Sequence, residues 1–134
     1  MSYSLHIART DDWMDAAKLP IVRREVVNLV EADRELSWST TEYVDLRQKN
    51  GTIIRLPYIK WNGTSCFLWR LDQILCRNPD EAQTAKMVRI AEKLGAIVVG
   101  DHGERYTLRR TLFGRRRVHL IQPAAETLSL QSAS

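Results

Sequence analysis

Apolar residues recur along this chain with two different periods. Residues 3–9 alternate apolar and polar side chains, with Tyr3, Leu5 and Ile7 on one face. That alternation is typical of a half-buried β-strand. Over 22–33 the apolar positions instead fall three or four residues apart, which is the spacing of an amphipathic helix. The pattern therefore predicts a strand, a loop and then a helix.

A second helix has sharper boundary signals. Asn78 is a good N-cap, Pro79 suits the first helical position, and Gly95 is a helix stop. The signals predict a helix over 79–94. The short apolar run that follows predicts a strand over 96–100.

Between the helices, residues 40–77 return to a period of two. Asn50-Gly51 and Asn62-Gly63 each offer the left-handed residues that a two-residue type I′ hairpin requires, so they predict a meander of three strands. A further strand at about 73–77 is expected to pair back onto the third through a short turn near Leu71.

Two type I′ turns would set the register of this meander. Val44 would face Pro57 across the first hairpin, and Ile59 would face Cys66 across the second. Alternate residues share a face, so one face is predicted to be aliphatic and the other aromatic. The aliphatic face holds Val44, Leu46, Pro57, Ile59, Cys66, Leu68, Ile74 and Cys76. The aromatic face holds Tyr43, Ile54, Leu56, Tyr58, Phe67, Trp69 and Leu75.

These elements predict an α+β fold with a single antiparallel-rich sheet. The sheet comprises the meander around 40–77 and the strands at 3–9 and 96–100, with two helices packed on one face. The second apolar face must then be covered by the C-terminal segment, by another subunit or by a partner.

The chain length of 134 residues predicts one domain. We expect that domain to span 1–121 and to include a basic hairpin at about 105–121. Residues 122–134 show no apolar period and are expected to be disordered.

The net charge of +4 is unevenly distributed. Residues 105–134 contain six arginines and one acid, whereas residues 1–104 contain 14 basic and 15 acidic groups. The arginine run at 115–117 resembles a phosphate-contacting segment. Such a segment binds nucleic acid, an acidic protein or a membrane surface, or it keeps a strand edge soluble, and we favour the last interpretation slightly.

Metal and redox sites are not indicated. His6, His102 and His119 do not stand at ligand spacing from one another or from a cysteine, so no metal is predicted. Cys66 and Cys76 could face one another as a redox pair, but free cysteines that act as small apolar side chains are commoner.

An acid, an imidazole and a second acid lie together at Asp101, His102 and Glu104. This is a combination that acid/base catalysis uses, but a surface turn has the same composition, and we favour the turn. No phosphate-binding glycine loop, dinucleotide fingerprint or nucleophile elbow is present in the sequence, so we predict no cofactor and no enzyme activity.

The expected location is the cytoplasm. The chain has two cysteines, starts without the basic and apolar regions of a signal peptide, and has no apolar run long enough to span a membrane. No membrane partner is therefore expected.

A set of short motifs is spread over residues 1–106: Met1-Ser2-Tyr3, Leu5-His6-Ile7, Asp12-Trp13, Pro20-Ile21, Asp33, Glu35-Leu36, Asn78-Pro79-Asp80, Lys86-Met87, Ile90-Ala91, Leu94-Gly95-Ala96, Gly100-Asp101, Gly103-Glu104 and Tyr106. These motifs resemble a family of small bacterial α+β proteins that are similar to immunity proteins, which block a toxin secreted between competing bacteria. The match covers the two ends of residues 1–106 better than the middle, and the extension beyond Tyr106 is peculiar to this chain.

The leading hypothesis is a non-enzymatic immunity protein that binds a cognate toxin and occludes its active site. The residues predicted to contact the toxin are Tyr43, Tyr58, Trp61, Phe67 and Trp69 as anchors, with Arg115, Arg116 and Arg117 steering an acidic surface. The alternatives are a nucleic-acid-associated accessory protein that uses the arginine segment and a small hydrolase built on Asp101, His102 and Glu104. A homodimer through the aromatic face is compatible with the leading hypothesis.

Overall fold

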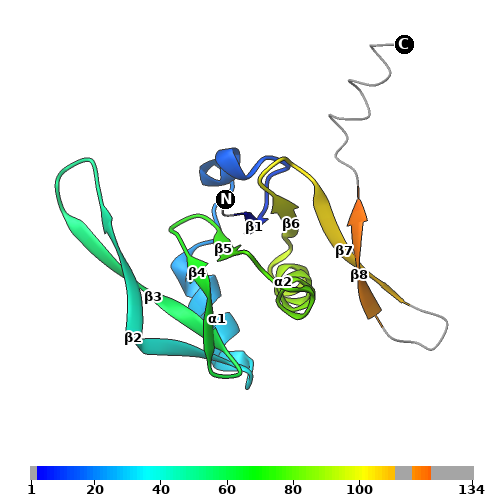
Figure 1. The fold of residues 1–134 in the computed structure, drawn as a ribbon. Helices are drawn as coiled ribbons and strands as arrows, with labels where there is room; N and C mark the ends of the chain where they lie inside the picture. Colours follow the sequence, from blue (N-terminus) through cyan, green and yellow to red (C-terminus); the bar gives the residue numbers. More distant parts are fainter. Residues whose placement is uncertain (1–2, 111–115, 122–134) are drawn as a thin grey trace, which may run out of the picture.

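The computed structural model describes residues 3–110 and 116–121 (Figure 1). Its elements follow the chain as β1 (Ser4–Ala8), the 3-10 helix η1 (Trp13–Lys18), α1 (Arg23–Ala32), β2 (Leu36–Arg47), β3 (Ile53–Trp61), β4 (Thr64–Trp69), β5 (Ile74–Arg77), α2 (Glu81–Leu94), β6 (Ile97–Gly100), β7 (Arg105–Arg110) and β8 (Arg116–Ile121).

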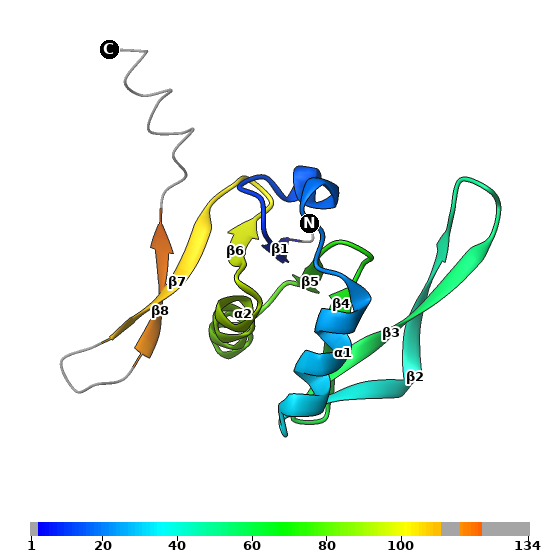
Figure 2. The ribbon, with the colours of Figure 1, turned by 180° about the vertical axis from the view of Figure 1, so that it is seen from behind.

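The strands of the described residues form one antiparallel sheet in the order β2-β3-β4-β5-β1-β6-β7-β8. The first strand of the chain is thus inserted between β5 and β6. The β2–β3 hairpin and the β7–β8 hairpin lie at opposite ends (Figures 1 and 2). The predicted α+β fold is confirmed, and so is a hairpin within 105–121.

Helix α2 begins at Glu81, two residues later than predicted. Asp80 is the N-cap: its side chain accepts a hydrogen bond from the Gln83 amide, and the Gln83 side chain accepts one from the Asp80 amide. Asn78 instead adopts a φ of +49° and accepts a hydrogen bond from the amide of Tyr3 at 2.8 Å. Gly95 ends the helix in the left-handed conformation, as predicted.

Both helices pack on one face of the sheet through a single apolar core. Ile7 of β1, Val26 of α1 and Met87 of α2 belong to the same cluster and are each fully buried. On this face, five residues are successive neighbours across five strands: Trp69, Ile74, Ile7, Val98 and Tyr106. The sheet face with odd-numbered β1 residues is therefore the core face.

The first predicted register is wrong by one residue. Val44 pairs with Leu56 rather than Pro57, because Gln48 and Thr52 close a loop of three residues in which only Gly51 has a positive φ. This is the alternative that Asn-Gly sequences allow, a type I turn followed by a left-handed glycine.

The second hairpin has the predicted type I′ turn, with Asn62 at φ +48° and Gly63 at φ +87°. Trp61 then pairs with Thr64 as expected, but the register shifts by one residue farther along the two strands. Ile59 consequently pairs with Phe67, not with Cys66. The shift moves Phe67 and Trp69 to the core face, so the predicted aromatic face does not form.

The other face of the central strands is covered by the chain itself. Its register row includes Leu68, Leu75, His6 and Val99, of which Leu68, His6 and Val99 are buried. The ring of Trp13 in η1 stacks on His6, with 4.4 Å between ring centroids. The expectation that this sheet face needs a second subunit or a partner to cover it is wrong for the central strands, whose residues Leu68, His6 and Val99 are buried within the chain itself.

One buried ion network joins the two helices to β2. Lys86 of α2, which is 6% exposed, donates to Asp33 after α1 and to Glu35 before β2, both at 2.7 Å. Burial disfavours the charged amine, but the hydrogen bonds and charges of the two carboxylates outweigh this and raise the pKa of Lys86.

Candidate functional site

An apolar groove lies between α1, the β2–β3 hairpin and the β4–β5 turn. Its volume is about 540 Å³, which is within the range of ligand and peptide pockets. The lining residues are Arg23, Val27, Trp38, Ile54, Arg55, Leu56, Pro57, Trp69 and Leu71. Its two charged residues are both arginines, so the groove suits an apolar surface that carries negative charge.

A bend in β2 gives the groove one of its walls. The register jumps between Trp38 and Tyr43, so that the intervening residues of β2 bulge out of the ladder. Ser39, which is buried, organises the bulge: its Oγ accepts hydrogen bonds from the amides of Thr41 and Glu42 at 3.3 and 2.9 Å. Beyond the bulge the outer part of the hairpin stands away from the body (Figures 1 and 2).

The floor of the groove is held by Trp69. Its indole Nε1 donates to the carbonyl of Ile21 at 2.8 Å, and its ring packs against the core cluster. The ring is therefore fixed in position, with part of its surface left in the groove. A preordered aromatic side chain of this kind loses little conformational freedom when it binds a partner.

Leu71 forms the lip of the groove in a strained turn. Its φ is +71°, and the amide of Asp72 donates to the carbonyl of Arg70 at 2.9 Å, closing a three-residue turn around it. Turns of this type with a positive central φ are rare, and glycine would occupy the position without steric cost. The leucine is nevertheless there and is 38% exposed.

The predicted contact residues are dispersed in the structure. Tyr43 is exposed and lies under the guanidinium of Arg55, 3.7 Å from the ring centroid to Cζ. Tyr58 is half-buried on the second sheet face. Trp61 is half-buried, and its Nε1 donates to Glu35 at 3.2 Å. Of these residues and Trp69, only Trp69 lines the groove.

Phe67 is fully buried, so the prediction that it is an exposed anchor is wrong. The backbone of Arg116 and Arg117 lies in β8, opposite Arg110 and Arg109. Arg115 and the tail at 122–134 lie outside the described residues, and their predicted roles stay predictions.

Sequence reasoning missed the combination of Val27, Trp38 and Leu71 that completes the groove. The bulge in β2 and the positive φ of Leu71 bring these residues near Trp69, and neither feature has a glycine or proline to indicate it. The one available signal in the sequence was a single apolar residue, Leu71, in an otherwise polar turn over 70–73.

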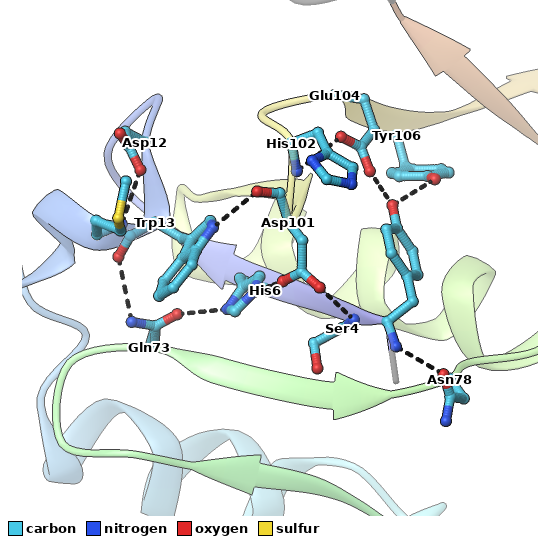
Figure 3. Close-up of polar contacts among 12 residues, drawn as sticks. Ser4, His6, Asp12, Trp13, Gln73, Asn78, Asp101, His102, Glu104 and Tyr106 are labelled. Carbon is cyan, nitrogen blue, oxygen red and sulfur yellow. Dashed lines mark hydrogen bonds and ion pairs between the residues drawn. The ribbon is translucent and has the colours of Figure 1, made fainter. Parts of the chain in front are cut away.

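A second cluster, at the end of β1, is polar and internally satisfied (Figure 3). Nδ1 of His6 is 2.7 Å from Oε1 of Gln73, and Nε2 is 2.9 Å from Oδ1 of Asp101. The other carboxylate oxygen of Asp101 accepts from the Ser4 amide at 3.0 Å. Both ring nitrogens of His6 are therefore engaged with protein groups.

The neighbouring acid is similarly engaged. Glu104 accepts hydrogen bonds from the hydroxyl of Tyr3 and from the amide of His102. Burial, together with these contacts, raises the pKa of Tyr3. The two acids of the turn thus hold the N-terminal strand against the β6–β7 connection, which supports the turn interpretation over a catalytic one.

Both cysteines are free thiols. Burial raises the pKa of Cys66 to about 11 and that of Cys76 to about 12. Nucleophilic and redox cysteines need a lowered pKa, so these two are structural. Within residues 3–110 and 116–121, no three His, Cys, Asp or Glu residues gather as a metal site.

Comparison of the chain with family models, curated proteins and solved structures found no match. Neither α1 nor α2 is long and apolar enough to cross a membrane, and the same is true of every helix in the described part of the chain.

The Asp101 contacts predict a specific acid sensitivity. Burial alone would raise the pKa of Asp101, but hydrogen bonds from His6 and the Ser4 amide outweigh it and lower that pKa. A lowered folded-state pKa gives stability that is present above the ordinary value of 3.8 and is lost as the pH falls through the folded value. We therefore expect the urea midpoint to fall as the pH is lowered from 5 to 3.

The Asp101→Asn variant should be less stable than the wild type at pH 7. An asparagine side chain has one acceptor oxygen, whereas the two carboxylate oxygens of Asp101 contact His6 and the Ser4 amide separately. The difference should shrink toward pH 3. A constant difference between the two proteins at all pH values would contradict this role of Asp101.

Proposed function

We propose that this chain is a non-enzymatic immunity protein that binds a cognate bacterial toxin and occludes its active site. The groove between α1, the β2–β3 hairpin and the β4–β5 turn is the binding surface. It takes an apolar segment of the toxin that carries acidic residues, because the charged residues lining it are Arg23 and Arg55, the second of which is also paired with Asp45.

The observation that carries the proposal is the strained, exposed leucine at the lip. Strain of the order of 1–3 kcal/mol persists where the surrounding structure maintains it, and such positions cluster at binding sites. The positive φ of Leu71 is unfavourable for a leucine. Its side chain lines the groove and can contact a molecule bound there. The resemblance to immunity proteins supports a toxin as the partner.

The polar cluster supports a binding role over a catalytic one. His6, Asp101 and Glu104 each bond to groups that hold strands together, and His6 is only 5% exposed. Cys66 and Cys76 remain protonated thiols at neutral pH. These five side chains are thus engaged in structure.

The test is to co-express this chain in a laboratory bacterial strain with the product of each flanking gene, one of which the proposal predicts to contain a toxin domain. The wild-type chain should restore growth and should elute with the toxin domain as one complex in gel filtration. Equal killing with and without this chain would refute the proposal.

The Leu71→Gly variant separates binding from folding. We expect its free energy of unfolding to be unchanged or raised by up to about 1 kcal/mol, because glycine relieves the positive φ. Growth rescue should be lost, because the lip contact is removed. The matched control is Leu19→Gly, which removes an exposed leucine outside the groove and should rescue growth fully. Full rescue by Leu71→Gly would show that the groove is not the binding surface.

A further inference from the structure

The buried ring of His6 has one partner on each nitrogen, and both partners are oxygen atoms (Figure 3). Nε2 lies 2.9 Å from a carboxylate oxygen of Asp101, and Nδ1 lies 2.7 Å from Oε1 of Gln73. A neutral imidazole has one N–H donor and one acceptor nitrogen, so it can donate to only one of these two oxygens. The imidazolium form has two donors and can satisfy both.

The contacts of Gln73 leave its amide with one orientation. Nε2 of Gln73 donates to the carbonyl of Trp13 at 3.2 Å and to Oδ1 of Asp72 at 3.1 Å. Reversing the amide would place Oε1 against the carbonyl oxygen of Trp13, which has no hydrogen to donate. Oε1 therefore faces His6, and Nδ1 of the ring must carry the hydrogen that joins them.

The surroundings of the ring on the other side also suit a cation. Burial alone would raise the pKa of Asp101, but hydrogen bonds from His6 and the Ser4 amide outweigh it and lower that pKa, so the carboxylate is ionised at neutral pH. Nε2 must then be a donor as well. The ring of Trp13 lies parallel to the imidazole at an angle of 3° between the ring planes, and the face of an indole attracts a cation.

Gln73 connects this ring to the lip of the groove. Its backbone carbonyl accepts a hydrogen bond from the amide of Arg70 at 2.8 Å, which closes the β4–β5 turn around Leu71. Its side chain joins the same turn to His6 and, through the carbonyl of Trp13, to η1. A change at the ring therefore acts directly on the residue that closes the strained turn.

From this pattern of donors and acceptors we infer that His6 makes the groove sensitive to pH. With both ring nitrogens protonated, His6 holds η1 and the β4–β5 turn in place, whereas loss of one proton leaves an acceptor without a donor and loosens the turn that carries Leu71. A histidine changes its charge between about pH 5 and 8, so the lip is ordered at the acid end of that range and loosened at the alkaline end. The inference concerns regulation of the groove and in that respect rests on the proposed function.

Titratable groups from two connections lie around His6. The β6–β7 connection supplies Asp101, which contacts the ring, and His102, whose charge acts on Asp101. The β4–β5 turn supplies Asp72 through its contact with Gln73. The flanking strands and η1 supply residues that do not titrate in this range: Leu75, Val99 and Trp13. His102 is thus the second histidine that an experiment must separate from His6.

The test is an NMR titration of the isotope-labelled full chain between about pH 5 and 8. At the acid end, the nitrogen chemical shifts of the His6 ring should show a proton on both nitrogens. The amide signals of Leu71 and Gln73 should then shift with the same midpoint as the His6 ring. The control variant His102→Gln removes an exposed imidazole and should leave this shared titration in place.

The variant Gln73→Met tests the connection itself, because it removes the acceptor from Nδ1 and keeps a side chain of similar length. The His6 ring should still titrate in this variant, but the Leu71 amide should no longer follow it. His6 itself stays intact, so the measurement does not depend on the stability of a variant at the buried position.

Three results would overturn the inference: a single protonated ring nitrogen on His6 at about pH 5, a Leu71 amide that does not follow the ring in the wild type, or a shared titration that survives Gln73→Met or is lost in His102→Gln. None of these measurements involves the toxin. A failure here would therefore leave the growth-rescue result unchanged, and a failure of growth rescue would leave the titration unchanged.

Discussion

Replacing Lys86 with alanine is expected to lower the free energy of unfolding by about 3–5 kcal/mol, the usual cost of removing one partner from a buried ion pair. The large cost is expected because the side chain of Asp33 is only 9% exposed and would lose its closest cation. Burial alone would raise the pKa of Asp33, but Lys86 and the Glu35 amide outweigh it and lower that pKa. The variant would thus keep a buried carboxylate whose charge is compensated only by the Glu35 amide and by the exposed Lys93.

Urea unfolding at pH 7, followed by circular dichroism, measures this effect. The matched control is Lys93→Ala, which removes a second lysine of α2 that lies 3.6 Å from the same carboxylate but is 59% exposed. That change should cost less than about 1 kcal/mol, as exposed ion pairs do.

The Lys86→Ala deficit should also narrow as the pH falls from 7 toward 3, since protonation of Asp33 removes the buried negative charge. Equal effects of the two lysine substitutions would show that the Lys86 pair is not the one that stabilises the fold.

The second large effect is expected at Phe67. Truncation to alanine should cost about 3–5 kcal/mol, the range for a buried aromatic residue that leaves a cavity. Phe67 has no exposed surface and pairs with Ile59 on the core face, where both belong to the same apolar cluster.

Tyr43→Ala is the informative comparison, because the sequence pattern groups Tyr43 and Phe67 on one face. Tyr43 is 45% exposed, and its main contact is the guanidinium of Arg55. The expected cost is about 1 kcal/mol or less, the value of an exposed cation–π contact. Similar losses for both variants in thermal or urea unfolding would contradict the observed register.

The periodic patterns were sufficient to predict α1, α2 and the presence of the strands, but β2 begins at Leu36 rather than at residue 40, and the predicted loop after β1 contains the 3-10 helix η1. Gly95 shows why the end of α2 could be predicted: a residue with one strongly preferred conformation marks a boundary whatever lies around it. Register was harder to predict. Asn50-Gly51 fits two loops that differ by one residue, and the sequence contains no feature that selects between them.

The register shift between Ile59 and Lys60 affected the candidate site more than the loop at Asn50-Gly51 did. It occurs next to a correctly predicted turn and is not marked by a glycine, so only packing can select it. A displacement of one residue exchanges the two faces of a strand. The groove depends on this shift, on the β2 bulge and on the Leu71 turn, which explains why composition and spacing could not locate it.

The strand order keeps the groove far from the β7–β8 hairpin. Four strand spacings separate β4, which supplies Trp69 to the groove, from β7. At about 4.8 Å each, they put roughly 19 Å between the groove and the hairpin, more than twice the distance of about 8 Å over which physiological salt screens a charge. A change of charge in the hairpin should therefore leave affinity at the groove unaltered.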